Sequence, residues 1–291
     1  MSFFDIIIVG VVMIKIKINS KFDIHSTITS GQIFRFDVEN DGSYTVILKD
    51  RIVNLKFIGN ELFVESNNED NLETIIIDYL DLKRDYESID NFILSKESKL
   101  KTTVMESKGL KMVHSFPFET SISYIISARN SVPSISRSVN ILSEKYGTKT
   151  LFKDKTYYLF PTPQQLKNVS IKDYNDAKTG FRDKYLYEFV QRINSKEINL
   201  ESINSMSTKE AFDYLLDIKG IGPKVASCIL LFAYSRFDVF PIDTWVMKAA
   251  NDLYGTSNIK EIEKITYDKF GEYVAIALQY MFHWKRNLSG K

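Results

Sequence analysis

The first part of the chain shows the two-residue alternation of strands that are buried on one face. Residues 13–18 read Met-Ile-Lys-Ile-Lys-Ile, with apolar and charged side chains in strict alternation. Four further apolar stretches follow, and clusters of Asn, Asp and Gly separate most of them, as turns require. We therefore predict an antiparallel meander that ends near residue 66, with strands at 13–18, 32–38, 44–48, 51–57 and 61–65.

After residue 67 the spacing of apolar positions becomes that of amphipathic helices. Residues 72, 75, 76, 79 and 80 fall on one helical face, and Pro and Gly punctuate the segments that follow. The expected fold class is α+β, with an N-terminal antiparallel sheet followed by a mainly helical body. We predict helices at 72–80, 86–95, 118–128, 134–146, 184–193, 209–218, 223–234, 244–253 and 272–284.

We place the boundary between two domains at residue 115. Residues 1–115 would form the sheet domain with its flanking helices, and residues 116–291 the helical body. The apolar run at the start, within residues 1–12, is too short to cross a bilayer and lacks the charge pattern of a signal peptide. We interpret these residues as an added strand or an extension, and we expect no membrane association.

The composition, with 44% apolar and 26% charged residues, is that of an ordinary globular protein. A net charge of +1 argues against a non-specific nucleic-acid coat, although a local basic face is compatible with a neutral whole. Cys228 is the one cysteine, which excludes a disulfide within the chain and an iron–sulfur cluster. It suits a reducing cytoplasm. We expect a monomer that uses no cofactor.

A short segment between two predicted helices has the features of a tight hairpin. Residues 216–224 read Leu-Asp-Ile-Lys-Gly-Ile-Gly-Pro-Lys. Gly220 and Gly222 can adopt positive φ and let another backbone come close, and Pro223 suits the first turn of a helix. The exposed N–H groups of such a turn can bind an anion, which on DNA is a phosphate. A plain helix–turn–helix corner that binds no ligand is the alternative interpretation.

Two ionisable side chains close to this hairpin are candidates for chemistry. Lys224 falls in the first turn of the second helix, where the helix dipole repels a cation and so favours the neutral amine that a nucleophile needs. Asp243 follows 19 residues later in Pro-Ile-Asp-Thr-Trp, at the start of the next helix. Asp243 acts either as a helix N-cap or as a carboxylate opposite Lys224, and the two roles are compatible. For Lys224 the alternative is a solvated surface lysine.

These residues resemble the helix-hairpin-helix DNA glycosylase superfamily. Its mark is Gly-apolar-Gly followed one helix later by an Asp after Pro-x, here at 220–222 and 241–243. A lysine at position 224 is typical of the bifunctional members, which are glycosylases and lyases together. Residues 220–228 are similar to the 8-oxoguanine branch, as are Ser-Gly-Gln-Ile-Phe-Arg-Phe at 30–36 and Phe-Arg-Asp-Lys-Tyr at 181–185. The likeness runs from about residue 14 to about residue 285, and places the helix-hairpin-helix at 208–235.

The resemblance implies a base-excision repair enzyme that binds double-stranded DNA containing 8-oxoguanine and flips the damaged base into a pocket. Lys224 would attack C1′ of the sugar and form a Schiff base, after which β-elimination nicks the strand. Asp243 would stabilise the positive charge that develops on the sugar. The Gly31 carbonyl would accept the N7–H that distinguishes 8-oxoguanine from guanine, with Cys228 and Phe282 on either side of the base.

The resemblance also implies roles outside the base pocket. Phe34 would be a wedge beside the base pair, and the carbonyls of Leu216, Ile218 and Ile221 would hold a structural monovalent cation. Taken singly, Phe34, Phe282 and Cys228 are as well explained as buried residues. The residues implied to contact DNA are Phe34, Asn130, Ser134, Phe181, Arg182, Gly220, Gly222, Val225 and Trp245.

The base pocket departs from the family pattern at one position. Leu278 stands where family members often carry a glutamine that reads the Watson–Crick edge of the flipped base. Gln279 is its neighbour, but one residue turns a helix by about 100°. We therefore expect Leu278 in the pocket, and we expect that Gln279 cannot take its place.

The residues that face the opposite strand depart further. The family's asparagine run is Arg-Asn-Ser here, so only Asn130 remains as an amide. The arginine pair that reads the opposite cytosine becomes Ser134 and Arg182, and Phe181 replaces a tyrosine. We expect weak discrimination of the base opposite the lesion, unless Arg129 compensates.

Two other functions remain open from the sequence. A glycosylase for alkylated bases, of the 3-methyladenine type, would share the fold but generally lacks the hairpin lysine. A non-catalytic helix-hairpin-helix DNA-binding protein would have no use for Lys224 and Asp243 together.

Overall fold

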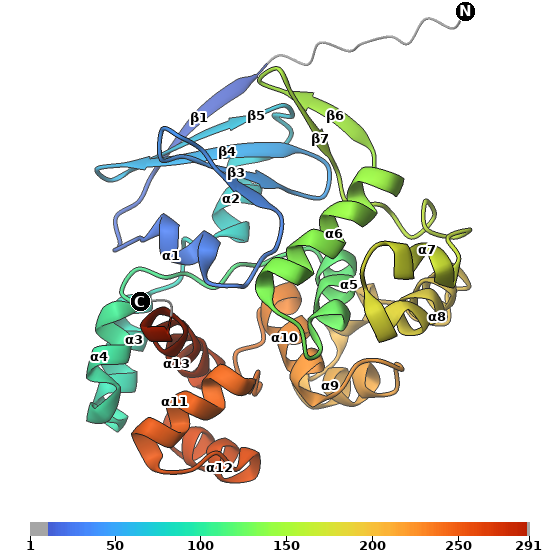
Figure 1. Ribbon diagram of the computed structural model, residues 1–291. Coiled ribbons are helices and arrows are strands. Elements are labelled where there is room, and N and C mark those ends of the chain that lie inside the picture. The colour runs from blue at the N-terminus through green and yellow to red at the C-terminus, as the bar shows by residue number, and fades with distance from the viewer. Residues whose placement is uncertain (1–10, 290–291) are drawn as a thin grey trace, which may run out of the picture.

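A five-stranded antiparallel sheet forms the N-terminal part of the protein (Figure 1). The computed structural model describes residues 11–289, and the strand order is β1-β5-β4-β3-β2. The chain from β2 to β5 makes the predicted meander, and β1 pairs with β5 at its edge, with Val12 opposite Ser66. The strands are β1 (Val12–Lys17), β2 (Phe36–Val38), β3 (Tyr44–Ile47), β4 (Ile52–Ile58) and β5 (Glu61–Ser66).

The helical body follows the sheet, so the predicted α+β fold class is confirmed (Figure 1). A second, two-stranded sheet inside the body was not expected: it is formed by β6 (Lys149–Phe152) and β7 (Lys155–Tyr158). The helices are α1 (Ile24–Thr29), α2 (Leu72–Tyr79), α3 (Tyr86–Lys96), α4 (Lys101–Glu106), α5 (Pro117–Ser127), α6 (Val132–Tyr146), α7 (Ile171–Asp176), α8 (Asp183–Asn194), α9 (Thr208–Leu216), α10 (Pro223–Tyr234), α11 (Thr244–Tyr254), α12 (Ile259–Phe270) and α13 (Val274–Ser289).

The second predicted strand, at 32–38, is mostly wrong. Only Phe36–Val38 pairs with β3, and α1 precedes it unpredicted. The reason is that Gln32 is buried and makes hydrogen bonds at 2.8 Å to Lys111 O and 2.9 Å from Val113 N. These bonds hold residues 30–35 against another segment instead of in the sheet. Of the predicted extension at 1–12, residues 1–10 lie outside the described part of the chain, and Val12 begins β1.

Two hydrophobic cores organise the molecule. One lies under the sheet and takes buried residues from Ile16 to Leu80, together with Val113. The other fills the helical body, and it includes Tyr86, Ile93 and Val104 from α3 and α4. Helix α10 lies at its centre, with every residue from Val225 to Tyr234 buried. The domain boundary at residue 115 stays a prediction, and α3 and α4 pack with the helical body.

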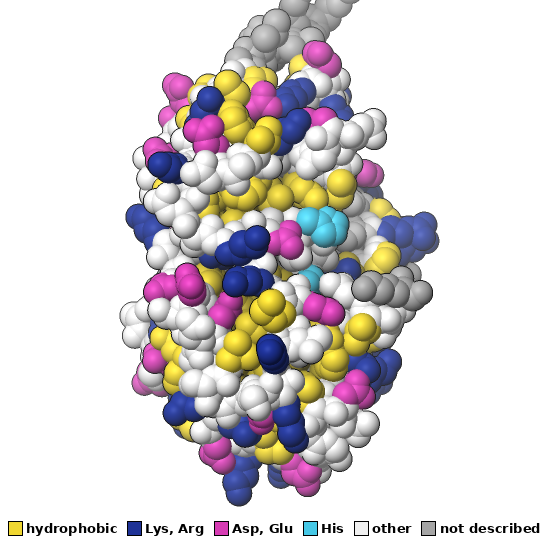
Figure 2. Space-filling view, turned by 90° about the vertical axis from the view of Figure 1, so that its left-hand side faces the viewer, with side chains coloured by type: hydrophobic (Ala, Val, Ile, Leu, Met, Phe, Trp, Pro, Cys, Tyr) yellow, Lys and Arg dark blue, Asp and Glu magenta, His cyan; other side chains and the backbone are white. Residues whose placement is uncertain are grey.

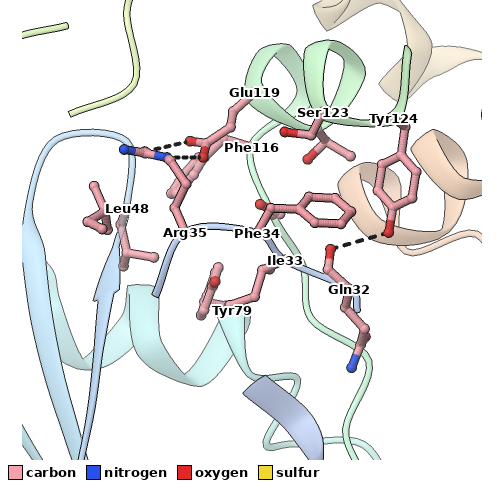
Figure 3. Close-up of a pocket in the computed structure, with 13 residues that line it drawn as sticks. Gln32, Ile33, Phe34, Arg35, Leu48, Tyr79, Phe116, Glu119, Ser123 and Tyr124 are labelled. Atoms are coloured by element: carbon pink, nitrogen blue, oxygen red, sulfur yellow. Dashed lines mark hydrogen bonds and ion pairs between the residues drawn. The ribbon is translucent and has the colours of Figure 1, made fainter. Parts of the chain in front are cut away.

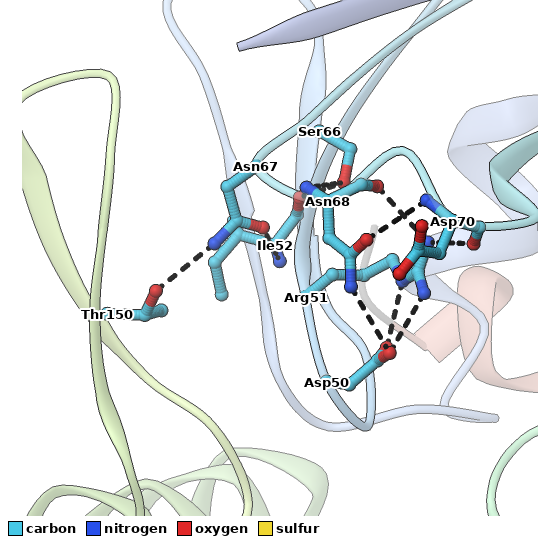
Figure 4. A network of polar contacts seen from close by, with 8 residues as sticks. All are labelled: Asp50, Arg51, Ile52, Ser66, Asn67, Asn68, Asp70 and Thr150. Carbon is cyan, nitrogen blue, oxygen red and sulfur yellow. Dashed lines mark hydrogen bonds and ion pairs between the residues drawn. The ribbon is translucent and has the colours of Figure 1, made fainter. Parts of the chain in front are cut away.

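Polar contacts join the β6–β7 hairpin to the large sheet (Figure 4). Asn67, just after β5, donates from Nδ2 to Thr150 Oγ1 at 3.1 Å and accepts from the backbone of Ile52 at 2.8 Å. Next to it, the buried Arg51 pairs with Asp50 at 2.8 Å and donates to the backbone carbonyl of Asp70 at 2.7 Å. These contacts tie the start of β4 and the end of β5 to the β6–β7 hairpin and to the loop before α2.

A buried ion pair joins the sheet domain to the helical body (Figure 3). Arg35, next to β2, donates from Nε and Nη2 to the two carboxylate oxygens of Glu119 on α5, at 2.6 and 3.1 Å. Its Nη1 also donates to the carbonyl of Tyr158 at 2.7 Å. The pair is bidentate and largely removed from water, so the loss of one partner would leave an uncompensated buried charge.

No helix between residues 11 and 289 is both long and apolar enough to cross a membrane. Basic and acidic side chains are interspersed over the face shown in Figure 2, in agreement with the net charge of +1.

The buried ion pair gives a prediction on stability. Replacing Glu119 with leucine should lower the free energy of unfolding by about 3–5 kcal/mol, because Arg35 loses its partner in a dry environment. The double replacement Arg35→Met with Glu119→Leu should lose much less, and Lys56→Met, at the surface pair with Asp41, should change little. Urea unfolding of the four proteins measures this. A single variant no less stable than the double variant would contradict the prediction.

Candidate active site

A cavity of about 730 Å³ lies among α5, α10, α11 and α13, and segments far apart in the sequence meet in it. Gly31 comes from the N-terminal domain, residues 127–133 from the end of α5, the turn after it and the start of α6, and Gly220 with residues 222–225 from the hairpin and the first turn of α10. The predicted site residues that line the cavity are Gly31, Phe34, Asn130, Gly220, Gly222, Lys224, Val225, Cys228, Asp243, Trp245 and Phe282.

Lys224 lies in the first turn of α10 and is partly exposed to the cavity. Its Nζ donates to Ser127 Oγ at 3.2 Å and lies 5.1 Å from the centre of the Tyr124 ring. Ser127 donates its own proton to the carbonyl of Tyr124 at 2.7 Å. The amine is therefore oriented by a hydroxyl and an aromatic face of α5, and no carboxylate forms an ion pair with it in the described structure.

Asp243 is the N-cap of α11, as predicted. Its Oδ1 accepts hydrogen bonds from the backbone N–H groups of Trp245 and Val246, both at 2.9 Å. Burial raises the pKa of the Asp243 carboxyl, while these two donors and the nearby Lys224 act in the opposite direction. Because the cap uses one oxygen, Oδ2 accepts no hydrogen bond from the described residues and is available to a ligand.

The hairpin between α9 and α10 has one glycine that its geometry requires. Gly220 has a φ of +89°, and a Cβ there would come within 2.7 Å of Tyr185 Cβ, so the prediction of positive φ is confirmed. The neighbour is a side chain and not a backbone. For Gly222 the same prediction is wrong: its φ is −97°, and a Cβ would meet nothing within 4 Å. Gly222 lies exposed at the cavity edge, where another molecule can approach its backbone.

Gly31 and Phe282 meet on the opposite side of the cavity. Gly31 has a φ of +81°, and the Phe282 ring lies 3.5 Å from the place where its Cβ would be. The Gly31 carbonyl accepts a long hydrogen bond from Tyr124 OH at 3.4 Å. Cys228 is buried on α10 and contributes to the same cavity, and burial raises the pKa of its thiol. The structure thus brings together the residues expected on both faces of a flipped base.

The expectation for Leu278 and Gln279 is wrong. Leu278 is fully buried in the helical core and does not line the cavity, whereas Gln279 does. Gln279 Nε2 donates to the carbonyl of Ser30 at 3.4 Å. The packing of α13 turns this helix so that residues 279, 282 and 286 face the cavity. An amide is therefore present there, one residue later than the family pattern places it.

Phe34 does not have the exposure of a wedge. Only 7% of it is exposed, and its ring packs edge-on against Tyr124 with centroids 5.5 Å apart (Figure 3). It belongs to the helical core, although it also borders the cavity. Phe181, by contrast, is 59% exposed just before α8. An intercalating side chain must reach the DNA, so Phe181 has the exposure that Phe34 lacks.

Arg182 is not free to read a base as expected. Only 6% of it is exposed, and its guanidinium donates to three backbone carbonyls, those of Ala128, Arg129 and Thr179. It fastens the turn after α5. In this turn Arg129 has a φ of +53° and an exposed side chain at the cavity.

The other residues of this region bond within the turn and the start of α6. Asn130 donates from Nδ2 to the carbonyl of Ile126 at 3.2 Å. Ser134 is exposed, and its hydroxyl accepts from Ser131 at 3.0 Å. It is short and lies outside the cavity lining.

The three hairpin carbonyls predicted to hold a cation lie away from the cavity lining. Ile218 O accepts the N–H of Ile221 at 3.0 Å, which leaves one of its lone pairs for another ligand. Within residues 11–289 no group of three or more His, Cys, Asp or Glu residues could hold a metal ion. Neutral carbonyl oxygens are therefore the ligands that this hairpin can offer.

The cavity residues that were not predicted as part of the site include Tyr124, Ser127, Gln279 and Arg286. Tyr124 and Ser127 lie on an apolar helix, and nothing in the local pattern separates them from core residues. Gln279 and Arg286 depend on the rotation of α13 about its axis, which tertiary packing decides. The spacing 279, 282 and 286 follows one helical face, and is the only local signal that could have found them.

Known proteins are similar to this chain in sequence and in fold. Residues 14–120 match the family model for the N-terminal domain of 8-oxoguanine DNA glycosylase. A probable N-glycosylase/DNA lyase of Methanothermobacter thermautotrophicus is 30% identical over 232 residues, which is 72% of this chain and 74% of that protein. A 3-methyladenine DNA glycosylase of Archaeoglobus fulgidus, at 20% identity with a TM-score of 0.81 over 94% of this chain and 99% of that one, shares the fold.

A relative of known structure matches nearly the whole chain. The 8-oxoguanine glycosylase/lyase of Clostridium acetobutylicum, in complex with double-stranded DNA containing cytosine opposite 8-oxoguanine, is 36% identical with a TM-score of 0.89 over 93% of both chains. Both parts of the fold, the sheet and the helical body with its hairpin, are thus matched. The chain belongs to the 8-oxoguanine DNA glycosylase family of bifunctional N-glycosylase/DNA lyases in base excision repair.

Proposed function

We propose that this enzyme excises 8-oxoguanine from double-stranded DNA and then cleaves the strand at the abasic site. The observation that carries the proposal is that Lys224, Asp243 and Gly31 line one cavity, although they come from three separate parts of the chain. A nucleophile, a carboxylate and a carbonyl acceptor are the groups that this reaction needs. Because the substrate is DNA, we place the enzyme with the chromosome, in the cytoplasm or nucleoid.

The proposed reaction begins at the amine of Lys224. With the damaged nucleotide flipped into the cavity, Lys224 Nζ forms a bond to C1′ while the bond from C1′ to N9 breaks and the base leaves with the electron pair. Asp243 Oδ2 stabilises the positive charge that develops on the sugar. Opening of the sugar ring gives a Schiff base between Lys224 and C1′. Loss of a proton from C2′ then expels the 3′ phosphate by β-elimination.

The DNA would be held mainly by the hairpin and the rim of the cavity. Gly222 is exposed, so the backbone N–H groups of this turn would suit a phosphate, since backbone donors position a duplex without reading its sequence. Phe181 is exposed as an intercalating side chain has to be, and Val225 and Trp245 line the cavity beside Lys224. A monovalent cation on the hairpin carbonyls would stiffen this turn.

The two alternatives lack support from the site. An alkylated-base glycosylase has no need of an amine nucleophile, and the likeness to the Archaeoglobus enzyme is one of fold. A DNA-binding module without activity would not need Lys224 to be oriented by Ser127 at 3.2 Å inside a cavity.

The first prediction concerns the nucleophile. Lys224→Gln should abolish both base release and borohydride trapping on a duplex with 8-oxoguanine, because only an amine forms the Schiff base that borohydride reduces. DNA affinity should be nearly unchanged, since the hairpin backbone is intact. Lys209→Gln, at an exposed lysine of α9, is the matched control and should react normally. Base release by Lys224→Gln at the normal rate would refute its role.

The second prediction separates capping from catalysis at Asp243. Asn caps a helix nearly as well as Asp, so Asp243→Asn should fold with a similar midpoint of thermal unfolding. Its single-turnover rate should nevertheless fall at least about a hundredfold, because an amide cannot stabilise a developing positive charge as a carboxylate does. Asp238→Asn, at the surface, serves as the control. If Asp243→Asn retains the rate of the unmodified enzyme, Asp243 is a cap alone.

The third prediction concerns the base opposite the lesion. Ser134 is too short to reach it and Arg182 is engaged with backbone carbonyls, so we expect excision opposite all four bases with cytosine favoured by less than about a hundredfold, roughly 2.7 kcal/mol. Ser134→Arg should raise the preference for cytosine. Asn140→Arg, which adds the same charge elsewhere on α6, should not.

Single-turnover excision from four duplexes that differ only in the opposite base measures this preference. Arg129 is the residue that could make the prediction fail, because its exposed guanidinium lies at the cavity. A cytosine preference of a hundredfold or more that disappears in Arg129→Ala would show that Arg129 is the reader, and the prediction would be wrong.

A further inference from the structure

Three consecutive backbone carbonyls are held by side chains of the helical body. Thr29 O accepts from Arg286 Nη1 at 3.1 Å, Ser30 O from Gln279 Nε2 at 3.4 Å, and Gly31 O from Tyr124 OH at 3.4 Å. Arg286 and Gln279 both come from α13. The Tyr124 hydroxyl also lies 3.3 Å from Gln32 O, so its proton is shared between two carbonyls (Figure 3). The strip that contains the lesion-reading carbonyl is therefore fixed against the body by donors of α5 and α13.

Arg286 has more donors than this role uses. A guanidinium carries five N–H groups, and the bond to Thr29 is the one hydrogen bond of Arg286 within residues 11–289. No carboxylate forms an ion pair with it in that range. The side chain is half-buried and lines the cavity, with its guanidinium carbon 5.9 Å from the centre of the Phe282 ring. The remaining N–H groups of Arg286, next to the Phe282 ring, can therefore donate to a ligand that carries a hydrogen-bond acceptor.

The position of Arg286 indicates which part of the base it meets. Its Nη1 lies 3.2 Å from the place where a Cβ of Gly31 would be, so it is next to the carbonyl that would accept N7–H. In 8-oxoguanine N7–H lies between O8 and O6. The O8 side adjoins the bond to the sugar and must face Lys224 and Asp243. Its neighbour Lys285 pairs with Asp252, which lies nine residues, about 13 Å, further along α11 than the N-cap Asp243. Arg286 therefore lies toward the end of α11 that is away from Asp243. The O6 side is then the one beside Arg286.

We infer that Arg286 is a specificity-determining residue that donates a hydrogen bond to O6 of the flipped base. This inference rests on the proposed function. Gly31 reads N7–H, which 8-oxoguanine and 8-oxoadenine share, whereas Arg286 reads the group at C6. A guanidinium only donates, so it accepts a carbonyl there and opposes the amino group of 8-oxoadenine.

The experiment compares Arg286→Met with the unmodified enzyme on matched duplexes carrying 8-oxoguanine, 8-oxoadenine or a tetrahydrofuran abasic analogue, each opposite cytosine. Affinities are measured with the Lys224→Gln replacement present throughout, so that binding of every duplex is measured without base excision. Excision of 8-oxoguanine and strand cleavage at a natural abasic site are measured with Lys224 intact. Lys285→Met is the control, because Lys285 pairs with Asp252 and does not line the cavity.

Arg286→Met should weaken binding and excision of 8-oxoguanine about 10- to 100-fold, as loss of a hydrogen bond from a charged donor does. Binding of 8-oxoadenine and of the abasic analogue should change by less than about threefold, and so should cleavage at the abasic site. Arg286→Lys, which keeps a cationic donor, should recover part of the loss.

Two results would overturn the inference. Equal losses for both oxidised purines would mean that Arg286 only positions the Gly31 strip, since both bases share N7–H. Equal losses for the abasic analogue as well would mean a phosphate contact or a general structural role. Failure of the proposed function is a separate result, in which the unmodified enzyme neither excises 8-oxoguanine nor is trapped by borohydride.

Discussion

The cavity depends on the way residues 30–35 leave the sheet domain and cross to the helical body. The buried amide of Gln32 donates to the carbonyl of Thr27 in its own segment and to that of Lys111 in a distant one, and it accepts the N–H of Val113. Arg35 then fixes the far end of the crossing to Glu119 on α5. Because both ends are held by buried polar contacts, Gly31 is presented to α13 and α10 in one position. Without that crossing, Gly31 would not close the cavity that Lys224 and Asp243 line.

The sequence was informative where a function depends on a local signal. Lys224 and Asp243 are at helix starts, and the signals for helix starts, Pro223 and an N-capping aspartate, are local. The sheet followed by helices also came from local periodicity. The rotation of α13 did not, because packing against the core decides which of Leu278 and Gln279 is inside. The six-residue helices α1, α4 and α7 are too short to show a period.

Three arginines also show what the local sequence cannot predict. Arg129, Arg182 and Arg286 look alike in the sequence, yet the first is exposed, the second is bound to three carbonyls and the third is half-buried in the cavity lining. A charged side chain is buried only where acceptors or an opposite charge converge on it, and this convergence is a property of the folded chain. With a net charge of +1 the protein relies on a few placed charges and dipoles, not on a general positive field.

The buried thiol of Cys228 has a consequence for an enzyme that works on oxidised DNA. Oxidants attack the thiolate, and a thiol that stays protonated and shielded is the least reactive form of cysteine. Burial raises the pKa of Cys228, which lies in the wall of the cavity and is the one cysteine of the chain. The oxidants that create the lesion in DNA should therefore react slowly with Cys228. The cavity wall then stays unmodified under the conditions in which the substrate becomes abundant.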